Sequence, residues 1–170
     1  MVEAYLEVLE EGYYEVKFAF EGLADENLWK RPAEGLLSVG ELAGHIAHWE
    51  AVRLAGEVGE TLKPDLAKCR VISPLIDHRF RYYPMTIATP PSEEHLAMTA
   101  EQVCSELLRV HNESVAHFKA LSPDLDSCPP GCPPNYTYRA FLKYLAFHVA
   151  YHTGQMFSVR HLLGEETPDN

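Results

Sequence analysis

Two histidines near the end of the chain carry the clearest chemical signal. His148 and His152 are four residues apart in a segment with a strongly helical pattern. Because an α-helix advances about 100° per residue, both imidazoles leave one face, about one turn apart. Both fall at the centre of the apolar stripe, where a polar ring without a partner is costly. One divalent metal ion would satisfy both rings together.

A third ligand is expected from the segment that follows Ser38. On a helical projection of that segment, His45 lies at the edge of the apolar stripe and His48 lies on the outer side. We therefore expect His45, His148 and His152 to hold a divalent ion, with an open position for water as in catalytic zinc sites. The alternative is that the three rings are core side chains bonded to neighbours.

The chemistry of the common zinc peptidases is not expected. Their His-Glu-x-x-His motif places a general base beside the ligands, but Val149 stands where that glutamate would be. A base would have to come from elsewhere, and the sequence leaves several candidates open. These are Glu41, Glu50, Tyr144 and Tyr151.

Further residues are candidates for lining the pocket or supporting the ligands. They are His48, Trp49, His111, Tyr144, Tyr151 and Gln155. Gln155 is expected either to orient a ligand histidine or bound water, or to bond to backbone at the edge of the core. His111 lies on an inward stripe and is favoured as a core histidine over a pocket residue. The remaining histidines, His78, His95, His117 and His161, are predicted to be surface residues.

Four segments with helical periodicity must position these residues. They cover about 2–22, 39–56, 99–121 and 138–163. Ser38 with Glu41, and Thr99 with Gln102, have the form of capping boxes, and Gly164 suits a left-handed helix end. Gly154, inside the last segment, predicts close approach of another helix, because a mid-helix glycine costs about 1 kcal/mol against alanine.

The long connection between the second and third segments predicts the topology. Residues 59–94 contain five prolines, which favour an extended crossover along the bundle, so the two helices it joins should run parallel. A loop of this length is also a common binding wall or lid. Three aromatic residues expected to be exposed, Trp29, Tyr82 and Tyr83, are candidates for a pocket wall or an interface.

Two motifs of the chain resemble those of the DinB/YfiT superfamily. They are the stretch from Ser38 through His45 to Glu50, and His148-x-x-x-His152-x-Gly154-Gln155-Met156. The resemblance implies an all-α, four-helix bundle of up-down-down-up topology, with a long crossover between helices 2 and 3. It also implies a zinc or nickel site at His45, His148 and His152, and a homodimer. Relatives include bacillithiol transferases and mycothiol-dependent maleylpyruvate isomerase, so a low-molecular-weight thiol is an expected cofactor.

The composition of the chain argues against some kinds of binding partner. The 170 residues carry a formal net charge of −11, which argues against nucleic acid and anionic membrane surfaces. No apolar run approaches the length of a membrane span, and the first residues lack a signal-peptide pattern. We expect one domain over residues 1–170, a cytoplasmic location and a small-molecule substrate. The four cysteines are too few for a disulfide scaffold, and Cys128 and Cys132 are expected to flank a rigid turn.

The favoured function is that of a metal-dependent enzyme acting on a small molecule. Thiol S-transfer, isomerisation through a thiol adduct, or hydrolysis would use a thiol or water activated by the metal. The alternative is a stress-response bundle that binds a metal or ligand without turnover.

Overall fold

The computed structural model describes residues 2–58, 64–82 and 89–168. Four long helices dominate it: α1 (Val2–Phe20), α3 (Val39–Ala55), α5 (Ala100–Leu121) and α6 (Tyr138–Leu162). The short elements are α2 (Asp25–Leu28), α4 (Glu93–Leu96) and the 3-10 turns η1 (Leu66–Lys68) and η2 (His78–Phe80). The described residues form no strand, so the all-α prediction is confirmed.

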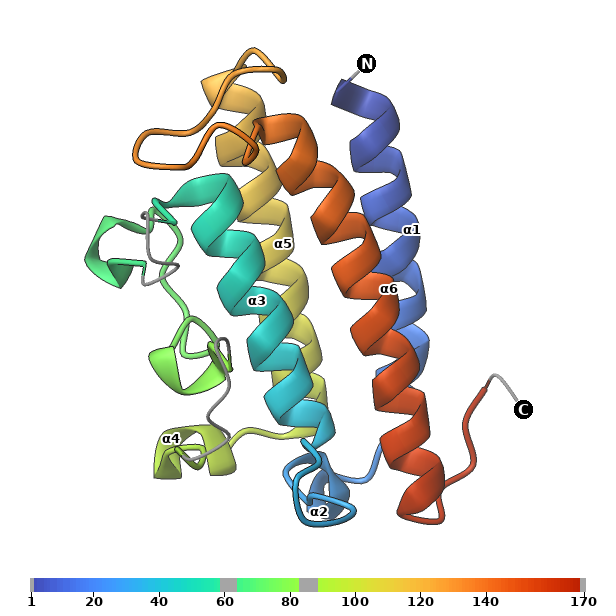
Figure 1. Cartoon of the computed structure of the whole chain (residues 1–170). Coiled ribbons are helices and arrows are strands. Elements are labelled where there is room, and N and C mark those ends of the chain that lie inside the picture. The colour runs from blue at the N-terminus through green and yellow to red at the C-terminus, as the bar shows by residue number, and fades with distance from the viewer. Residues whose placement is uncertain (1, 59–63, 83–88, 169–170) are drawn as a thin grey trace.

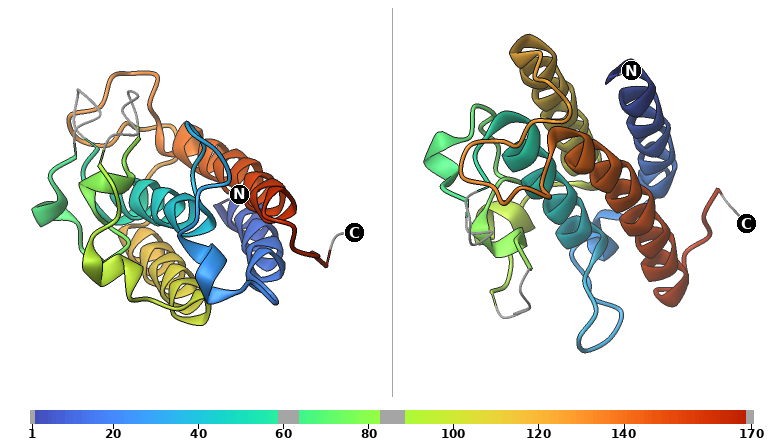
Figure 2. Two further views of the ribbon diagram at one scale, coloured as in Figure 1. Left: turned by 90° about the horizontal axis from the view of Figure 1, so that it is seen from below. Right: turned by 45° about the horizontal axis from the view of Figure 1, so that its top comes forward.

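The long helices form a four-helix bundle with the predicted topology. Figure 1 shows α1 and α6 running in one direction and α3 and α5 in the other. The parallel pair α3 and α5 is therefore joined by a crossover that returns along the bundle, as the long connection predicted. The view from below in Figure 2 shows the four helices surrounding a common core, with α6 beside α1 and α3.

Local sequence signals fix where the helices begin and end. Ser38 and Thr99 cap α3 and α5 through complete capping boxes with Glu41 and Gln102, as predicted. After α6, Gly164 has a φ of 81°, the left-handed conformation that glycine adopts at little cost. These caps satisfy backbone groups that a helix end would otherwise leave without partners.

The core is apolar and draws on all four long helices. Each contributes a leucine or isoleucine with no exposed surface, namely Leu9, Ile46, Leu107 and Leu145. Burial of such a side chain stabilises the fold by about 1.5–3 kcal/mol. The core thereby fixes the rotation of α3 and α6, and with it the direction in which their histidines point.

Two aromatic rings pack against α3 at glycine positions, Phe80 from the crossover and Trp29 from the connection between α2 and α3. A side chain at Gly44 would lie 2.5 Å from the ring of Phe80, and one at Gly40 would lie 2.6 Å from Trp29. Close approach thus occurs at these glycines of α3. The expectation for Gly154 is wrong, because that position is exposed and no heavy atom lies within 4 Å of an added Cβ.

Two of the three aromatic residues expected to be exposed are covered. Trp29 packs half-buried against Gly40, and Tyr82 is 9% exposed. Both side chains are covered because the crossover folds back on α3 and brings Phe80 close to each of them. Tyr83 lies outside the described residues.

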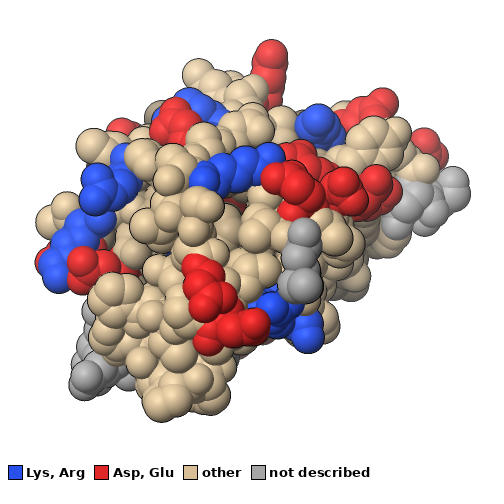
Figure 3. Space-filling model, turned by 90° about the horizontal axis from the view of Figure 1, so that it is seen from above, with Lys and Arg blue, Asp and Glu red and all other residues tan. Residues whose placement is uncertain are grey.

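The charged side chains are distributed over the surface of this acidic protein. Figure 3 views the end of the bundle at the top of Figure 1, where acidic and basic side chains are interspersed. The described residues show no continuous basic surface on this face. No described helix is both long enough and apolar enough to cross a membrane.

Candidate metal centre

Three histidines from two helices converge where α3 and α6 face each other. One ring nitrogen each of His45, His148 and His152 lies within 4.8 Å of the other two. The ring centroids of His148 and His152 are 4.4 Å apart, and that of His45 lies 4.9 and 4.7 Å from them. Tetrahedral ligands of a zinc ion are about 3.4 Å apart. Small ring rotations would therefore bring the three nitrogens to metal-binding distance.

Hydrogen bonds on the far side of two rings select the nitrogen that is free. His45 Nδ1 lies 2.8 Å from the carbonyl oxygen of Phe80, and His152 Nδ1 lies 2.6 Å from Oε1 of Gln155. Since these oxygens only accept, each Nδ1 carries the proton and donates it. Each Nε2 then presents its lone pair, as in metal-ligating histidines supported by a carbonyl oxygen.

The environment of His148 is best explained by a bound metal ion. Its side chain is 2% exposed, and neither ring nitrogen has a hydrogen-bond partner among the described residues. The ring stacks on Tyr144, with centroids 5.2 Å apart. A buried polar ring without a partner costs roughly 1–3 kcal/mol. A divalent ion shared with the other two histidines would remove that cost.

Burial keeps the three imidazoles neutral. It lowers the pKa of His45 to about 3, with the charge of His152 contributing. Burial and the charges of the other two histidines lower the pKa of His148, and burial lowers that of His152. Neutral rings keep the lone pairs that a metal ion requires, so protons do not compete strongly for this site at neutral pH.

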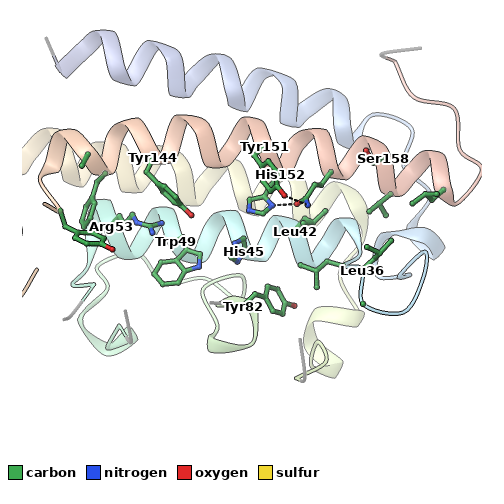
Figure 4. Close-up of a pocket in the computed structure, with 18 of the residues that line it drawn as sticks. Leu36, Leu42, His45, Trp49, Arg53, Tyr82, Tyr144, Tyr151, His152 and Ser158 are labelled. Atoms are coloured by element: carbon green, nitrogen blue, oxygen red, sulfur yellow. Dashed lines mark hydrogen bonds between the residues drawn. The ribbon is translucent and has the colours of Figure 1, made fainter. Parts of the chain in front are cut away.

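Two members of the triad, His45 and His152, line a pocket of about 800 Å³ between α3 and α6, whereas His148 lies behind its wall. Figure 4 shows His45 and His152 near its middle, Arg53 near one end, and Leu36 and Ser158 near the other. The lining residues are Gly35, Leu36, Leu37, Leu42, His45, Trp49, Arg53, Tyr82, Asn135, Tyr136, Ala140, Phe141, Tyr144, Tyr151, His152, Gln155, Ser158, Val159 and Leu162. No aspartate or glutamate is among them. Most of the wall is apolar or aromatic, as in small-molecule sites.

Four of the predicted pocket residues line it. They are Trp49, Tyr144, Tyr151 and Gln155. Trp49 also donates its indole N–H to the carbonyl oxygen of Arg81, at 2.8 Å, which ties the crossover to the pocket. Gln155 bonds to His152 rather than to backbone, so the first of its two predicted roles is supported.

His48 is placed differently from the prediction. Its side chain is fully buried rather than on the outer side, and it is not part of the pocket lining. The helical projection failed because the crossover covers this face of α3, bringing His78 to a centroid distance of 6.2 Å from His48. Neither ring nitrogen of His48 has a partner among the described residues.

His111 is the core histidine that the sequence favoured, and not a pocket residue. Its Nδ1 lies 2.7 Å from Glu50, and its ring stacks on Tyr13 at 3.8 Å. Tyr13 donates its hydroxyl to the same carboxylate, at 2.8 Å. Glu50 is therefore committed to a buried network between α1, α3 and α5, away from the pocket.

Glu41 also has a structural role, since its carboxylate is occupied by other residues. Its carboxylate pairs with Arg31 and accepts from the backbone and side chain of Ser38. Of the four proposed bases, only Tyr144 and Tyr151 therefore line the pocket. The hydroxyl of Tyr82 also donates to Glu41, at 3.2 Å.

Two pocket residues escaped the sequence analysis. Arg53 lies on the face of α3 that carries His45 and Trp49, so the same helical projection would have found it. Tyr82 has a φ of 46°, which a bulky residue rarely adopts. Nothing in the local sequence indicates that conformation, because it depends on how the crossover is anchored to α3.

No other described histidine or cysteine belongs to the triad cluster. His78, His117 and His161 are exposed as predicted, but His95 is 2% exposed, because its ring caps α4 and reaches the carbonyl oxygen of Pro74. Cys128 and Cys132 are free thiols. The turn between them is closed by a backbone bond from Cys132 to Pro129, as the prolines indicated.

The family of this chain follows from its match to a known family model. The model of the DinB superfamily matches residues 9–156, which include all three clustered histidines and both motifs that resembled it. The chain belongs to the DinB superfamily. A search of the curated proteins and of the solved structures found no match. The DinB assignment and the four-helix bundle agree with each other.

Proposed function

We propose that this DinB-superfamily protein binds a divalent ion, zinc or nickel first, through His45, His148 and His152. The observation that carries this proposal is the buried ring of His148, which has no hydrogen-bond partner among the described residues and clusters with two other imidazoles. Three protein nitrogens leave at least one coordination position for a small molecule, as in catalytic sites. The adjoining pocket gives such a molecule access.

We further propose that the protein is an enzyme acting on a small molecule, with a low-molecular-weight thiol or water as the second reactant. A divalent ion at this site would supply Lewis acidity and lower the pKa of the thiol or water. The chain's own groups have separate roles. Gln155 holds the proton on His152 Nδ1, and the hydroxyls of Tyr144 and Tyr151 are the pocket groups available to exchange a proton with substrate.

Metal analysis of matched variants tests the ligand assignment. Elemental analysis of the purified wild type should give about one zinc or nickel ion per chain, and His148→Ala and His152→Ala should lose it. His117→Ala is the control, because His117 is exposed on α5. Undiminished metal in both ligand variants, with intact helix content by circular dichroism, would contradict the assignment.

Turnover is tested separately from binding. The metal-loaded protein should release product from a thiol-acceptor or ester panel, and His148→Ala should lose that activity. Full metal occupancy with no turnover on the whole panel would favour the alternative, a bundle that binds a metal or ligand without catalysis.

A further inference from the structure

A half-buried cation, Arg53, lies at one end of the pocket. The guanidinium carbon of Arg53 lies 4.6 Å from the ring centroid of Trp49 and 4.3 Å from that of Tyr144. Its Nη1 is buried and has no hydrogen-bond partner in the described part of the chain. Burial lowers the pKa of Arg53 to about 10, so the group is still charged at neutral pH.

The described residues supply no anion to match this charge. Among residues 2–58, 64–82 and 89–168, no carboxylate lies within 4.0 Å of the guanidinium, and none lines the pocket. This is unusual in a chain of net charge −11. Aromatic faces compensate only part of the cost of burying a cation. The start of α6, whose dipole is positive at that end, adds to the positive potential.

We propose that Arg53 is the binding site for the carboxylate of the substrate, and that the substrate is a small amphipathic carboxylic acid. This inference rests on the proposed function, since it describes the molecule that reaches the metal. The carboxylate would lie against Arg53 near the start of α6. The apolar part would extend past the triad toward Leu36, near the far end of the same pocket (Figure 4).

The lining favours a carboxylate over a phosphate. A guanidinium presents paired N–H donors in a plane, which match the two oxygens of a carboxylate. Among the described residues that line the pocket, Arg53 is the one lysine or arginine, so they offer a dianionic phosphate no second cation. The aromatic rings beside Arg53 form a flat, apolar wall, which suits a singly charged carboxylate better than a phosphate.

The positions of Arg53 and His45 on α3 set the distance between the proposed carboxylate site and the histidine triad. The backbones of Arg53 and His45 are about 12 Å apart along the helix axis, at about 1.5 Å per residue. Their functional groups are closer, because the guanidinium and the His148 ring both contact the ring of Tyr144. The carboxylate and the reacting group are therefore different parts of one ligand. The site would select for acids that carry a second functional group further along an apolar chain.

Binding of a charged probe and its neutral counterpart tests this proposal. Phenylbutanoate and phenylbutanamide have nearly the same shape, and isothermal titration calorimetry gives a Kd for each. We expect the metal-free wild type to bind the acid at least about tenfold more tightly than the amide, a difference of about 1.4 kcal/mol. Equal affinities would overturn the proposal without any variant.

Variants then locate the charge that the probe senses. Arg53→Met should remove the preference for the acid and change the Kd of the amide by less than about threefold, since methionine keeps apolar bulk. Arg53→Lys keeps the charge and should retain part of the preference. Arg70→Met removes one exposed charge and should behave as wild type. Thermal melting of each variant verifies that it is folded.

Repeating the titration with zinc separates this inference from the metal assignment. A preference that is present without metal and lost in Arg53→Met supports the arginine site, even if the histidines fail to hold an ion. A preference that appears only with zinc and survives in Arg53→Met would mean that the carboxylate binds the metal, and would overturn the proposal.

Discussion

Each imidazole of the triad is held by a different neighbour. His45 is fixed by a carbonyl oxygen of the crossover, His152 by a side chain one turn further along α6, and His148 by stacking on Tyr144. The two hydrogen bonds fix the ring tautomers as well as the orientations. The three rings are therefore largely positioned in the protein without a metal, which would reduce the ordering cost of the binding that we propose.

Gln155 offers the most direct test of this support. Gln155→Ala removes the acceptor for His152 Nδ1 without touching a ligand. We expect zinc affinity to fall by about 10- to 100-fold, as is typical when such a partner is lost. Competition with a chelator of known affinity measures the change. An unaltered zinc Kd would show that the bond does not orient the ring.

His111 provides a prediction on pH. Burial alone would lower its pKa, but the hydrogen bond and charge of Glu50, together with Glu10, outweigh that and raise it. A raised pKa means that the folded state binds the proton more tightly than the unfolded state. The stabilisation is thus complete below the unfolded value of 6.5 and is lost as pH rises through the folded value.

His111→Gln should therefore destabilise the protein more at low pH than at high pH. The loss at pH 6 should be about 1–3 kcal/mol, the range for a buried hydrogen bond to a charged group. Urea unfolding of wild type and variant from pH 6 to pH 9 measures it. A difference between the two proteins that grows with pH would contradict the sign.

At the scale of elements, α3 carries glycines where the crossover comes closest. Gly44→Ala places a methyl group against the ring of Phe80, whose carbonyl oxygen also accepts from His45. We expect it to lose about 1–3 kcal/mol of stability, as for overpacking elsewhere. Gly154→Ala is the matched comparison, because its Cβ meets nothing within 4 Å. It should gain up to about 1 kcal/mol, and urea unfolding measures both. A destabilised Gly154→Ala would mean that this face of α6 is covered by a partner.

Elements that depend on local chemistry were predictable from sequence. Capping residues and apolar periodicity gave the four long helices to within a few residues, and the length and prolines of the crossover gave the parallel pair. The triad followed because each of its histidines lies on a face that periodicity defines. The short helices α2 and α4 were not predicted, because such turns depend on their caps and on packing rather than on a periodic pattern.

Features set by tertiary contact were not predictable. The crossover buries His48 and Tyr82, and the capping geometry of α4 buries His95, none of which leaves a periodic signal. The helical projection of α3 assumed that its outer face meets solvent. That assumption failed wherever the crossover lies on the helix, so the pocket wall on that side was missing from the prediction.

On the scale of the whole molecule, the chain is strongly acidic, yet no described residue that lines the pocket is acidic. Some carboxylates form caps, ion pairs and the buried Glu50 network instead, and most of the others described are exposed. This arrangement leaves the divalent ion that we propose and Arg53 as the charges that face a ligand. The homodimer expected from the resemblance stays a prediction, which light scattering of the purified protein would test.

A metal that joins α3 to α6 should stabilise the whole bundle. Zinc at about 100 times its Kd contributes about 2.7 kcal/mol, which for a domain of this size raises Tm by about 5–10 °C. Differential scanning fluorimetry measures the shift. His148→Ala should show little shift, whereas an equal shift in that variant would place the zinc elsewhere.

X-ray absorption at the metal edge tests the central claim most directly, because it reports the ligands of the bound ion itself. We predict three imidazole nitrogens at about 2.0 Å, completed by at least one non-imidazole light-atom ligand. The imidazole signal should weaken in His152→Ala. A spectrum dominated by sulfur, or one without imidazole scattering, would contradict a site built from His45, His148 and His152.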